Sequence, residues 1–137
     1  MPSIERTVPV SEVMTSRVHT AGPQQKLGEI WQILVGERCH HIPIVEDGRP
    51  VGMISTRDLL HVARKYGSQR LSEADYGSQI ASEIMSTDLE TIDADEPVEV
   101  AIDRIGRGDI HALVVVSEDN RLVGIVTNHD LLDYLIS

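Results

Sequence analysis

The chain has 137 residues, of which 41% are hydrophobic and 25% are charged, a composition typical of a soluble globular protein. Its formal net charge is -10, which argues against a nucleic-acid partner because binding to phosphate backbones needs a clustered basic surface. A single cysteine excludes an internal disulfide, and no apolar run approaches the roughly 20 residues that span a bilayer. We therefore expect a cytoplasmic protein that does not enter a membrane.

The first half of the chain predicts a small α+β unit. A short extended piece at residues 17–20 precedes an amphipathic helix, and a hairpin follows with strands at residues 41–45 and 50–55. Asp47-Gly48 between the strands is typical of a tight hairpin turn, and a final helix is expected to begin at Thr56. The apolar positions of the first helix follow helical spacing and are Leu27, Ile30, Trp31, Leu34 and Val35. We interpret Trp31 as a core residue.

The second half repeats this order. An extended piece is expected at residues 88–92, strands at 112–116 and 122–127, and a last helix from Asn128. Asp95 is the predicted cap of the intervening helix. The apolar stripe of that helix comprises Val98, Ala101, Ile102 and Ile105. We predict one repeat at residues 8–66, a polar linker at 67–79, which contains part of a twice-occurring Tyr-Gly-Ser-Gln, and a second repeat at 80–137.

The two halves also match residue by residue. Met14 aligns with Met85 and His40 with His111, both at an offset of 71 residues. The agreement is best at the end of each repeat, where residues 52–60 match residues 124–132 and share the pattern Gly-h-h-[Ser/Thr]-x-x-Asp, in which h is apolar. An internal duplication of this kind indicates a repeat architecture.

This duplicated pattern resembles the tandem cystathionine-β-synthase (CBS) domain proteins. The Met-Thr and Met-Ser starts of the two repeats and the strand His-Ile-Pro-Ile-Val at residues 41–45 support the resemblance. It implies an α+β fold of two β-α-β-β-α repeats, whose sheets pack about a pseudo-twofold axis. It also implies two clefts that hold adenosine-containing ligands.

The [Ser/Thr]-x-x-Asp segment lies where a strand ends and a helix begins. The start of a helix offers unpaired N–H groups to a phosphate, and a carboxylate such as that of Asp58 or Asp130 can accept hydrogen bonds from ribose hydroxyls. The alternative interpretation is a capping box, which only stabilises the helix. Arg57, and His129 at the equivalent position, are either phosphate contacts or ordinary surface residues.

The candidate nucleotide-binding residues fall into three groups. Those at the two helix starts are Ser55, Thr56, Arg57, Asp58, Thr127, Asn128, His129 and Asp130. The resemblance adds the starts of the central strands, which are His40, His41, His111 and Ala112. Apolar walls for an adenine would come from Val18, Leu89 and Ile110, and the alternative is that these residues are simply part of the core. Although Cys39, His40 and His41 are consecutive, neighbours on a strand point to opposite faces, so we expect no metal site.

We therefore expect a regulatory sensor module that binds AMP, ADP, ATP or a related adenosyl ligand. The alternative is a structural dimerisation module with unoccupied clefts that acts through a protein partner. We find no nucleophile–base pair, Walker loop or paired cysteine motif, so we expect neither an enzyme nor a catalytic cofactor. The resemblance and the amphipathic helices predict a homodimer, which would act on an effector protein still to be identified.

Overall fold

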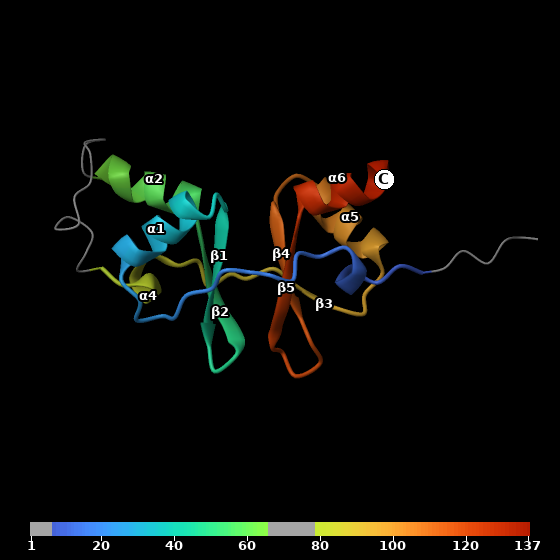
Figure 1. Ribbon diagram of the computed structural model, residues 1–137, viewed down its shortest axis with the longest axis horizontal. Helices are drawn as coiled ribbons and strands as arrows, with labels where there is room; N and C mark the ends of the chain where they lie inside the picture. The colour runs from blue at the N-terminus through green and yellow to red at the C-terminus, as the bar shows by residue number, and fades with distance from the viewer. Residues whose placement is uncertain (1–6, 66–78) are drawn as a thin grey trace, which may run out of the picture. The chain divides into compact units, whose positions relative to one another are not determined.

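The computed structural model describes residues 7–65 and 79–137, so nearly all of the predicted linker and the repeated Tyr-Gly-Ser-Gln lie outside the described residues. The chain forms two compact units. One unit comprises residues 18–89, and the other combines residues 90–137 with the N-terminal residues up to 17. In each unit, helices cover one face of a small sheet (Figure 1). Within the described residues, no helix is both long and apolar enough to cross a membrane.

The unit of residues 18–89 is built on a two-stranded antiparallel sheet. Its elements are α1 (Leu27–Gly36), β1 (His41–Glu46), β2 (Arg49–Ser55), α2 (Thr56–Lys65) and α4 (Ala81–Ile84). The predicted hairpin is confirmed, with φ angles of 54° at Asp47 and 79° at Gly48. Positive φ at both central residues gives the turn a twist that matches the strands. Instead of a strand at residues 17–20, a single parallel bridge joins Ala21 to Ile44.

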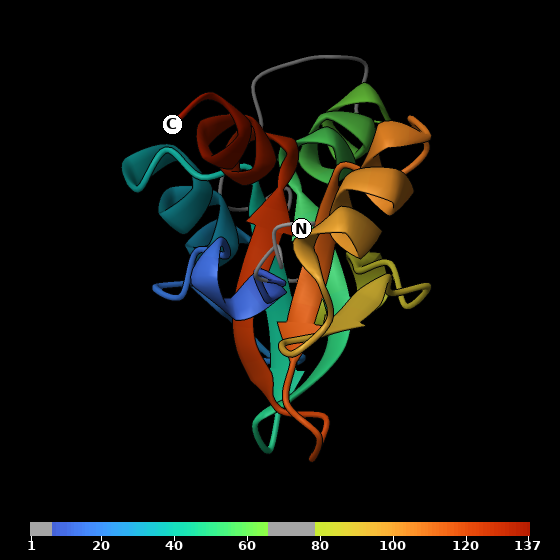
Figure 2. The ribbon, with the colours of Figure 1, turned by 90° about the vertical axis from the view of Figure 1, so that its right-hand side faces the viewer.

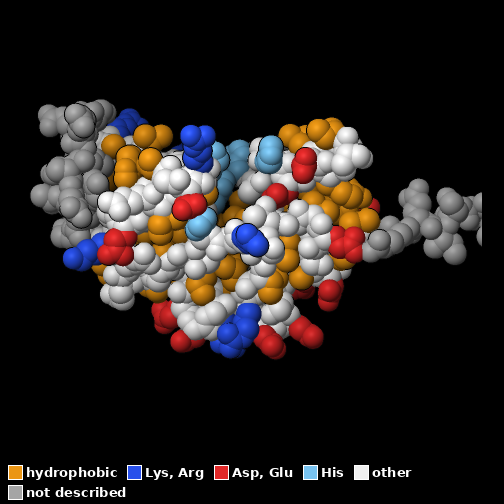
Figure 3. Space-filling view, in the orientation of Figure 1, with side chains coloured by type: hydrophobic (Ala, Val, Ile, Leu, Met, Phe, Trp, Pro, Cys, Tyr) orange, Lys and Arg blue, Asp and Glu red, His pale blue; other side chains and the backbone are white. Residues whose placement is uncertain are grey.

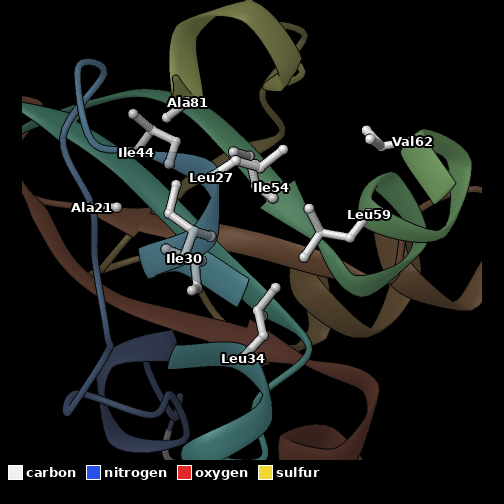
Figure 4. Close-up of a cluster of buried hydrophobic side chains, with 10 residues drawn as sticks. Ala21, Leu27, Ile30, Leu34, Ile44, Ile54, Leu59, Val62 and Ala81 are labelled. Atoms are coloured by element: carbon white, nitrogen blue, oxygen red, sulfur yellow. The ribbon is translucent and has the colours of Figure 1, made fainter. Parts of the chain in front are cut away.

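The core of this unit lies between α1, α2 and the sheet. Leu27, Ile30 and Leu34 of α1 are buried in one apolar cluster with Ile44 and Ile54 of the sheet (Figure 4). The interpretation of Trp31 as a core residue is wrong, because its exposed fraction is 36%, and Val35 is 62% exposed. At about 100° per residue, position 31 lies about 65° round the helix from the centre of the buried stripe 27, 30 and 34, at the edge of the face that packs on the sheet. The apolar face of α1 is therefore wider than its buried face.

The other unit has a three-stranded sheet in the order β3-β4-β5 (Figure 2). Its elements are η1 (Val10–Glu12), β3 (Thr91–Asp93), α5 (Val98–Gly106), β4 (Ala112–Val116), β5 (Leu122–Thr127) and α6 (Asn128–Ile136). Strand β3 is parallel to β4, and β4 is antiparallel to β5. The extended piece expected at residues 88–92 is thus a strand displaced toward the C-terminus.

The predicted cap of α5 is also wrong. The N-cap is Pro97 rather than Asp95, and its side chain makes no capping hydrogen bond. Backbone carbonyls meet the first N–H groups instead, because the Val98 N–H donates to the Val8 oxygen at 2.9 Å. A carboxylate from Asp95 is therefore not needed at this helix start.

The segment that begins each repeat in the sequence packs in space on the other repeat. The backbones of Thr15 and Ile125 exchange two hydrogen bonds, with N–O distances of 2.8 and 2.9 Å. Ser86 and Met53 form the same pair, at 3.0 Å in both directions. Figure 2 shows the N-terminal segment beside β5. Val10 of this segment is fully buried in the core of the unit that holds residues 90–137.

Candidate functional site

The junction between β2 and α2 holds Asp58 in a fixed orientation. The Ser55 N–H and the Ser55 hydroxyl both donate to Asp58 Oδ2, at 2.8 and 3.1 Å. In return, the Asp58 N–H donates to Ser55 Oγ at 3.4 Å. This is the reciprocal pattern of a capping box, so the helix-stabilising alternative is realised here. It uses only one of the two carboxylate oxygens.

The junction between β5 and α6 repeats this arrangement. The Thr127 N–H and hydroxyl donate to Asp130 Oδ2 at 3.0 and 3.3 Å, and the Asp130 N–H donates back to Thr127 Oγ1 at 3.4 Å. Thr127 and Asp130 form a complete capping box. The two copies of the motif therefore make the same backbone hydrogen bonds, and each uses the carboxylate oxygen Oδ2 for its cap.

The junctions differ at the second carboxylate oxygen. The hydroxyl of Thr15 donates to Asp130 Oδ1 at 2.8 Å. At the other junction, no residue in the described part of the chain makes a hydrogen bond to Asp58 Oδ1. Asp58 therefore keeps an oxygen available to a ligand, whereas both oxygens of Asp130 are engaged.

Strand pairing brings the predicted strand starts to the same junctions. His41 lies opposite Ser55 in the β1–β2 register, and Ala112 lies opposite Thr127 in the β4–β5 register. The carbonyl of His40 accepts from the Thr56 N–H at 3.0 Å. Residues from separate parts of each repeat thus meet around each aspartate. The side chains of His40 and His111 are exposed.

The expected supply of unpaired N–H groups at the helix starts is smaller than the sequence suggests. The amides of Ser55, Thr56 and Asp58 are all paired, as described above. At the start of α6, the His129 N–H donates to Asn128 Oδ1 at 3.0 Å. The side chains of Arg57 and His129 are exposed. A phosphate would therefore have to be met chiefly by side chains rather than by the backbone.

The predicted apolar walls are half-buried. Ile110 packs against the core that contains Leu113 and Val126. Val18 and Leu89 are the first and last residues of the other compact unit. Their role as adenine contacts stays a prediction. Within the described ranges, no group of three or more His, Cys, Asp or Glu side chains could hold a metal ion.

Thr15 is the residue of this site that sequence reasoning did not identify. Its hydroxyl is 115 positions from Asp130 in the chain, and the bond requires the exchange of segments between repeats. The available signal was the hydroxyl that follows the methionine in both repeats, at Thr15 and Ser86.

Two units with the same α+β repeat and the same strand–helix junction define a tandem-repeat protein. A family model described as "CBS domain" matches the chain twice, at residues 10–65 and 81–137. The chain belongs to the CBS domain family, which confirms the resemblance seen in the sequence.

Relatives and solved structures agree with this assignment. The CBS domain-containing protein YhcV of Bacillus subtilis is 31% identical over 122 residues, covering 89% of this chain and 81% of YhcV. A homoserine O-acetyltransferase of Methanococcoides burtonii is 32% identical over 123 residues, which are 89% of this chain but 23% of that protein. The chain therefore spans less than a quarter of the length of that relative, so most of that protein lies outside the shared stretch.

A solved structure adds ligands to the comparison. The CBS domain pair of protein MJ0100 was determined in complex with 5′-methylthioadenosine and S-adenosyl-L-methionine. It is 25% identical to this chain, with a TM-score of 0.76, and the alignment covers 95% of this chain and 97% of that one.

Proposed function

We propose that this chain is a regulatory module that binds an adenosine-containing ligand at its strand–helix junctions. The observation that carries the proposal is the hydrogen bonding of the Asp58 carboxylate. Its Oδ2 is held by Ser55, while Oδ1 has no hydrogen-bond partner among the described residues. A carboxylate fixed in this way is oriented before the ligand arrives, so little side-chain entropy is lost on binding. Both ligands of the MJ0100 domain pair contain adenosine, which supports this ligand class.

In this proposal, each residue group has a separate task. Asp58 and Asp130 accept hydrogen bonds from ribose hydroxyls, and the strand starts at His40 and His111 border the nucleoside. Arg57 meets a phosphate where the ligand has one, because a guanidinium is always charged and suits phosphate geometry. The side chains of Val18, Leu89 and Ile110 would contact the adenine.

The net charge of the chain bears on which adenosyl ligand binds best. At -10, the overall field opposes an anion, and each phosphate must be compensated by a local donor. We propose that ligands with one phosphate or none, such as AMP or S-adenosylmethionine, bind more tightly than ATP. Lowering the ionic strength should widen this difference, because screening of the field weakens.

Isothermal titration calorimetry with AMP, ADP, ATP, S-adenosylmethionine and 5′-methylthioadenosine tests the proposal, with GMP as the control for base recognition. A ligand that binds should also raise the melting temperature, since binding at 100 times Kd stabilises a fold by about 2.7 kcal/mol. Absence of binding by every adenosyl compound would overturn the proposal.

A second candidate function is dimerisation without a ligand. An apolar groove between α1 and α2 is lined by Trp31, Leu34, Val35, Thr56, Leu59 and Leu60. Val35 and Leu60 are 62% and 66% exposed and line the same groove, and a contiguous exposed apolar patch marks an interaction site. The module would then act through a second copy and an effector protein. A dimer that forms while no adenosyl compound binds would favour this function.

The proposal includes no chemical reaction and no catalytic cofactor. The acetyltransferase named among the relatives shares with this chain a stretch that is 23% of its own length. We also propose a cytoplasmic location, since a cysteine that stays a free thiol suits a reducing compartment.

A further inference from the structure

We infer that the hydroxyl of Thr15 makes the two sites unequal, so that a ribose ligand binds first at Asp58 and more weakly at Asp130. This inference rests on the proposed function and specifies how its two sites are used. It follows from the number of hydrogen bonds that each carboxylate can still accept.

The acceptor capacity of Asp58 is half used. A carboxylate has about four lone-pair positions. Two of those on Asp58 Oδ2 take the hydrogen bonds from the N–H and hydroxyl of Ser55. The positions on Oδ1 remain, and a ribose offers two neighbouring hydroxyl donors. The number of acceptors at Asp58 therefore matches the number of donors on the sugar.

Asp130 lacks this match. Its Oδ2 takes the two hydrogen bonds from Thr127, and its Oδ1 takes a third from Thr15. The bond from Thr15, at 2.8 Å, is the shortest of the three. One lone-pair position remains, so a second ribose hydroxyl can bind only if Thr15 gives up its hydrogen bond.

The backbone keeps Thr15 in this place. Two hydrogen bonds tie Thr15 to Ile125, and the side chain of Met14 packs over Gly124. The equivalent residue Ser86 has the same backbone pairing with Met53, but within the described residues its hydroxyl makes no hydrogen bond to Asp58. The restraint thus acts at one junction only.

The experiment measures each site while the other is weakened. Asp58→Glu weakens the Asp58 site and Asp130→Glu weakens the Asp130 site, each in the full chain and titrated calorimetrically with AMP and with 5′-methylthioadenosine. In the Asp58→Glu background, adding Thr15→Val should tighten binding by about ten- to hundredfold, the range expected for one hydrogen bond to a charged group. Thr15→Ser restores the hydroxyl and should restore the weaker affinity. Ser86→Ala in the Asp130→Glu background is the matched control and should leave affinity unchanged.

A second readout separates competition from a purely structural role of Thr15. Replacing AMP by 2′-deoxy-AMP should weaken binding more at the Asp58 site than at the Asp130 site, and Thr15→Val should remove that difference. If no adenosyl compound binds the parent protein, the proposed function itself fails, and this inference with it. If the probes bind but Thr15→Val leaves affinity unchanged or lowers it, the inference alone is overturned.

Discussion

Each aspartate of the repeated motif caps a helix, and we propose that it also contacts a ligand, two roles that sequence reasoning treated as alternatives. Asp58 caps its helix with one oxygen and turns the other away from the cap. The capping bonds restrict the rotamer of the carboxylate, which is the condition for selective contact with a ligand. Capping and binding at this position therefore support each other, and finding the cap does not argue against a ligand.

Replacing Asp58 by Glu should separate the two roles. Glutamate is a normal partner in a capping box, so the free energy of unfolding should change little. The carboxylate moves by one methylene, so binding at this site should lose roughly 1.5–3 kcal/mol, the value of a hydrogen bond to a charged group. Calorimetry and urea denaturation measure the two effects. Asp133→Glu, at an exposed position on α6 outside the motif, is the control. Unchanged affinity in Asp58→Glu would contradict the assignment.

Cys39 provides a second prediction at the residue scale. Burial raises the pKa of its thiol, and the charge of Glu37 raises that pKa further, against an opposing effect of a backbone hydrogen bond. A raised pKa means less thiolate at neutral pH, and the thiolate is the reactive form. Iodoacetamide should therefore alkylate the folded protein more slowly than the urea-unfolded chain. Because Cys39 is the only cysteine, mass spectrometry reads its modification directly.

The effect of Glu37 tests the electrostatic part of this argument. Glu37→Gln removes the negative charge, so the pKa of Cys39 should fall and alkylation at a fixed pH should become faster. Glu29→Gln, in the first turn of α1, removes the same charge at the other end of the helix and should change the rate much less. Equal rates in both variants would show that access, rather than charge, controls Cys39.

At the scale of elements, most strands and helices could be predicted because their signals are local. The hairpin sequence Asp47-Gly48 and the period-3.6 stripe that begins at Leu27 each lie within one element. Trp31 was misplaced because periodicity defines an apolar face but not how much of that face another element covers. The cap at Asp95 failed because the competing acceptor, the carbonyl of Val8, comes from a distant segment.

The packing of each repeat's first segment on the other repeat could not be predicted either, because it also depends on contacts between distant parts of the chain. The sequence groups Met14 with the first repeat, whereas in space it packs on Gly124 of the second, and Met85 packs on Gly52. Alignment of repeats shows which residues are equivalent but not which copy they contact. The Thr15–Asp130 hydrogen bond depends on this exchange and was missed along with it.

The contact between Gly52 and Met85 leads to a prediction of coupling. A Cβ atom at position 52 would approach Met85 Cγ to 2.7 Å, so Gly52→Ala should destabilise the fold by roughly 1–3 kcal/mol through overpacking. All three of the nearest atoms belong to the side chain of Met85. Adding Met85→Ala should therefore remove the contacts with Sδ and Cγ and leave only that with Cβ, and the double variant should be more stable than the sum of the single losses by about 0.5–3 kcal/mol. Urea denaturation of the parent, the two single variants and the double variant measures this coupling.

Gly124 offers the matched comparison. A Cβ atom there would meet the backbone oxygen of Thr15 at 2.8 Å as well as the side chain of Met14. Shortening the side chain cannot move a backbone atom, so Met14→Ala should rescue Gly124→Ala much less than Met85→Ala rescues Gly52→Ala. Equal coupling energies in the two double-mutant cycles would show that the backbone at Thr15 moves to accommodate the added Cβ atom.

At the scale of the whole molecule, acidic charge coexists with exposed apolar side chains. The net charge of -10 favours solubility, while Leu60 on α2 and Leu132 on α6 are 66% and 57% exposed. Figure 3 shows hydrophobic side chains at the surface over both helices. These positions are equivalent in the two repeats, and the groove beside Leu60 is nearly all apolar. We propose that a second copy of the chain covers the exposed apolar side chains of each helix, because twofold dimers are the commonest oligomers.

Leu60→Glu and Leu132→Glu should each weaken this homodimer, because either substitution introduces a charge into the apolar contact. His61→Glu is the control, since it adds negative charge to an exposed position on the same helix without removing an apolar side chain. Sedimentation velocity across a range of protein concentrations gives the association state. The parent should associate more tightly at high salt, because each partner carries a net charge of -10 and screening weakens their repulsion. At low salt the added charge of His61→Glu should weaken its dimer, and raising the salt should reverse this loss because salt screens the repulsion. Leu60→Glu should stay weak at high salt, because salt does not restore the lost apolar contact. A parent protein that stays monomeric at high concentration and high salt would rule out the homodimer.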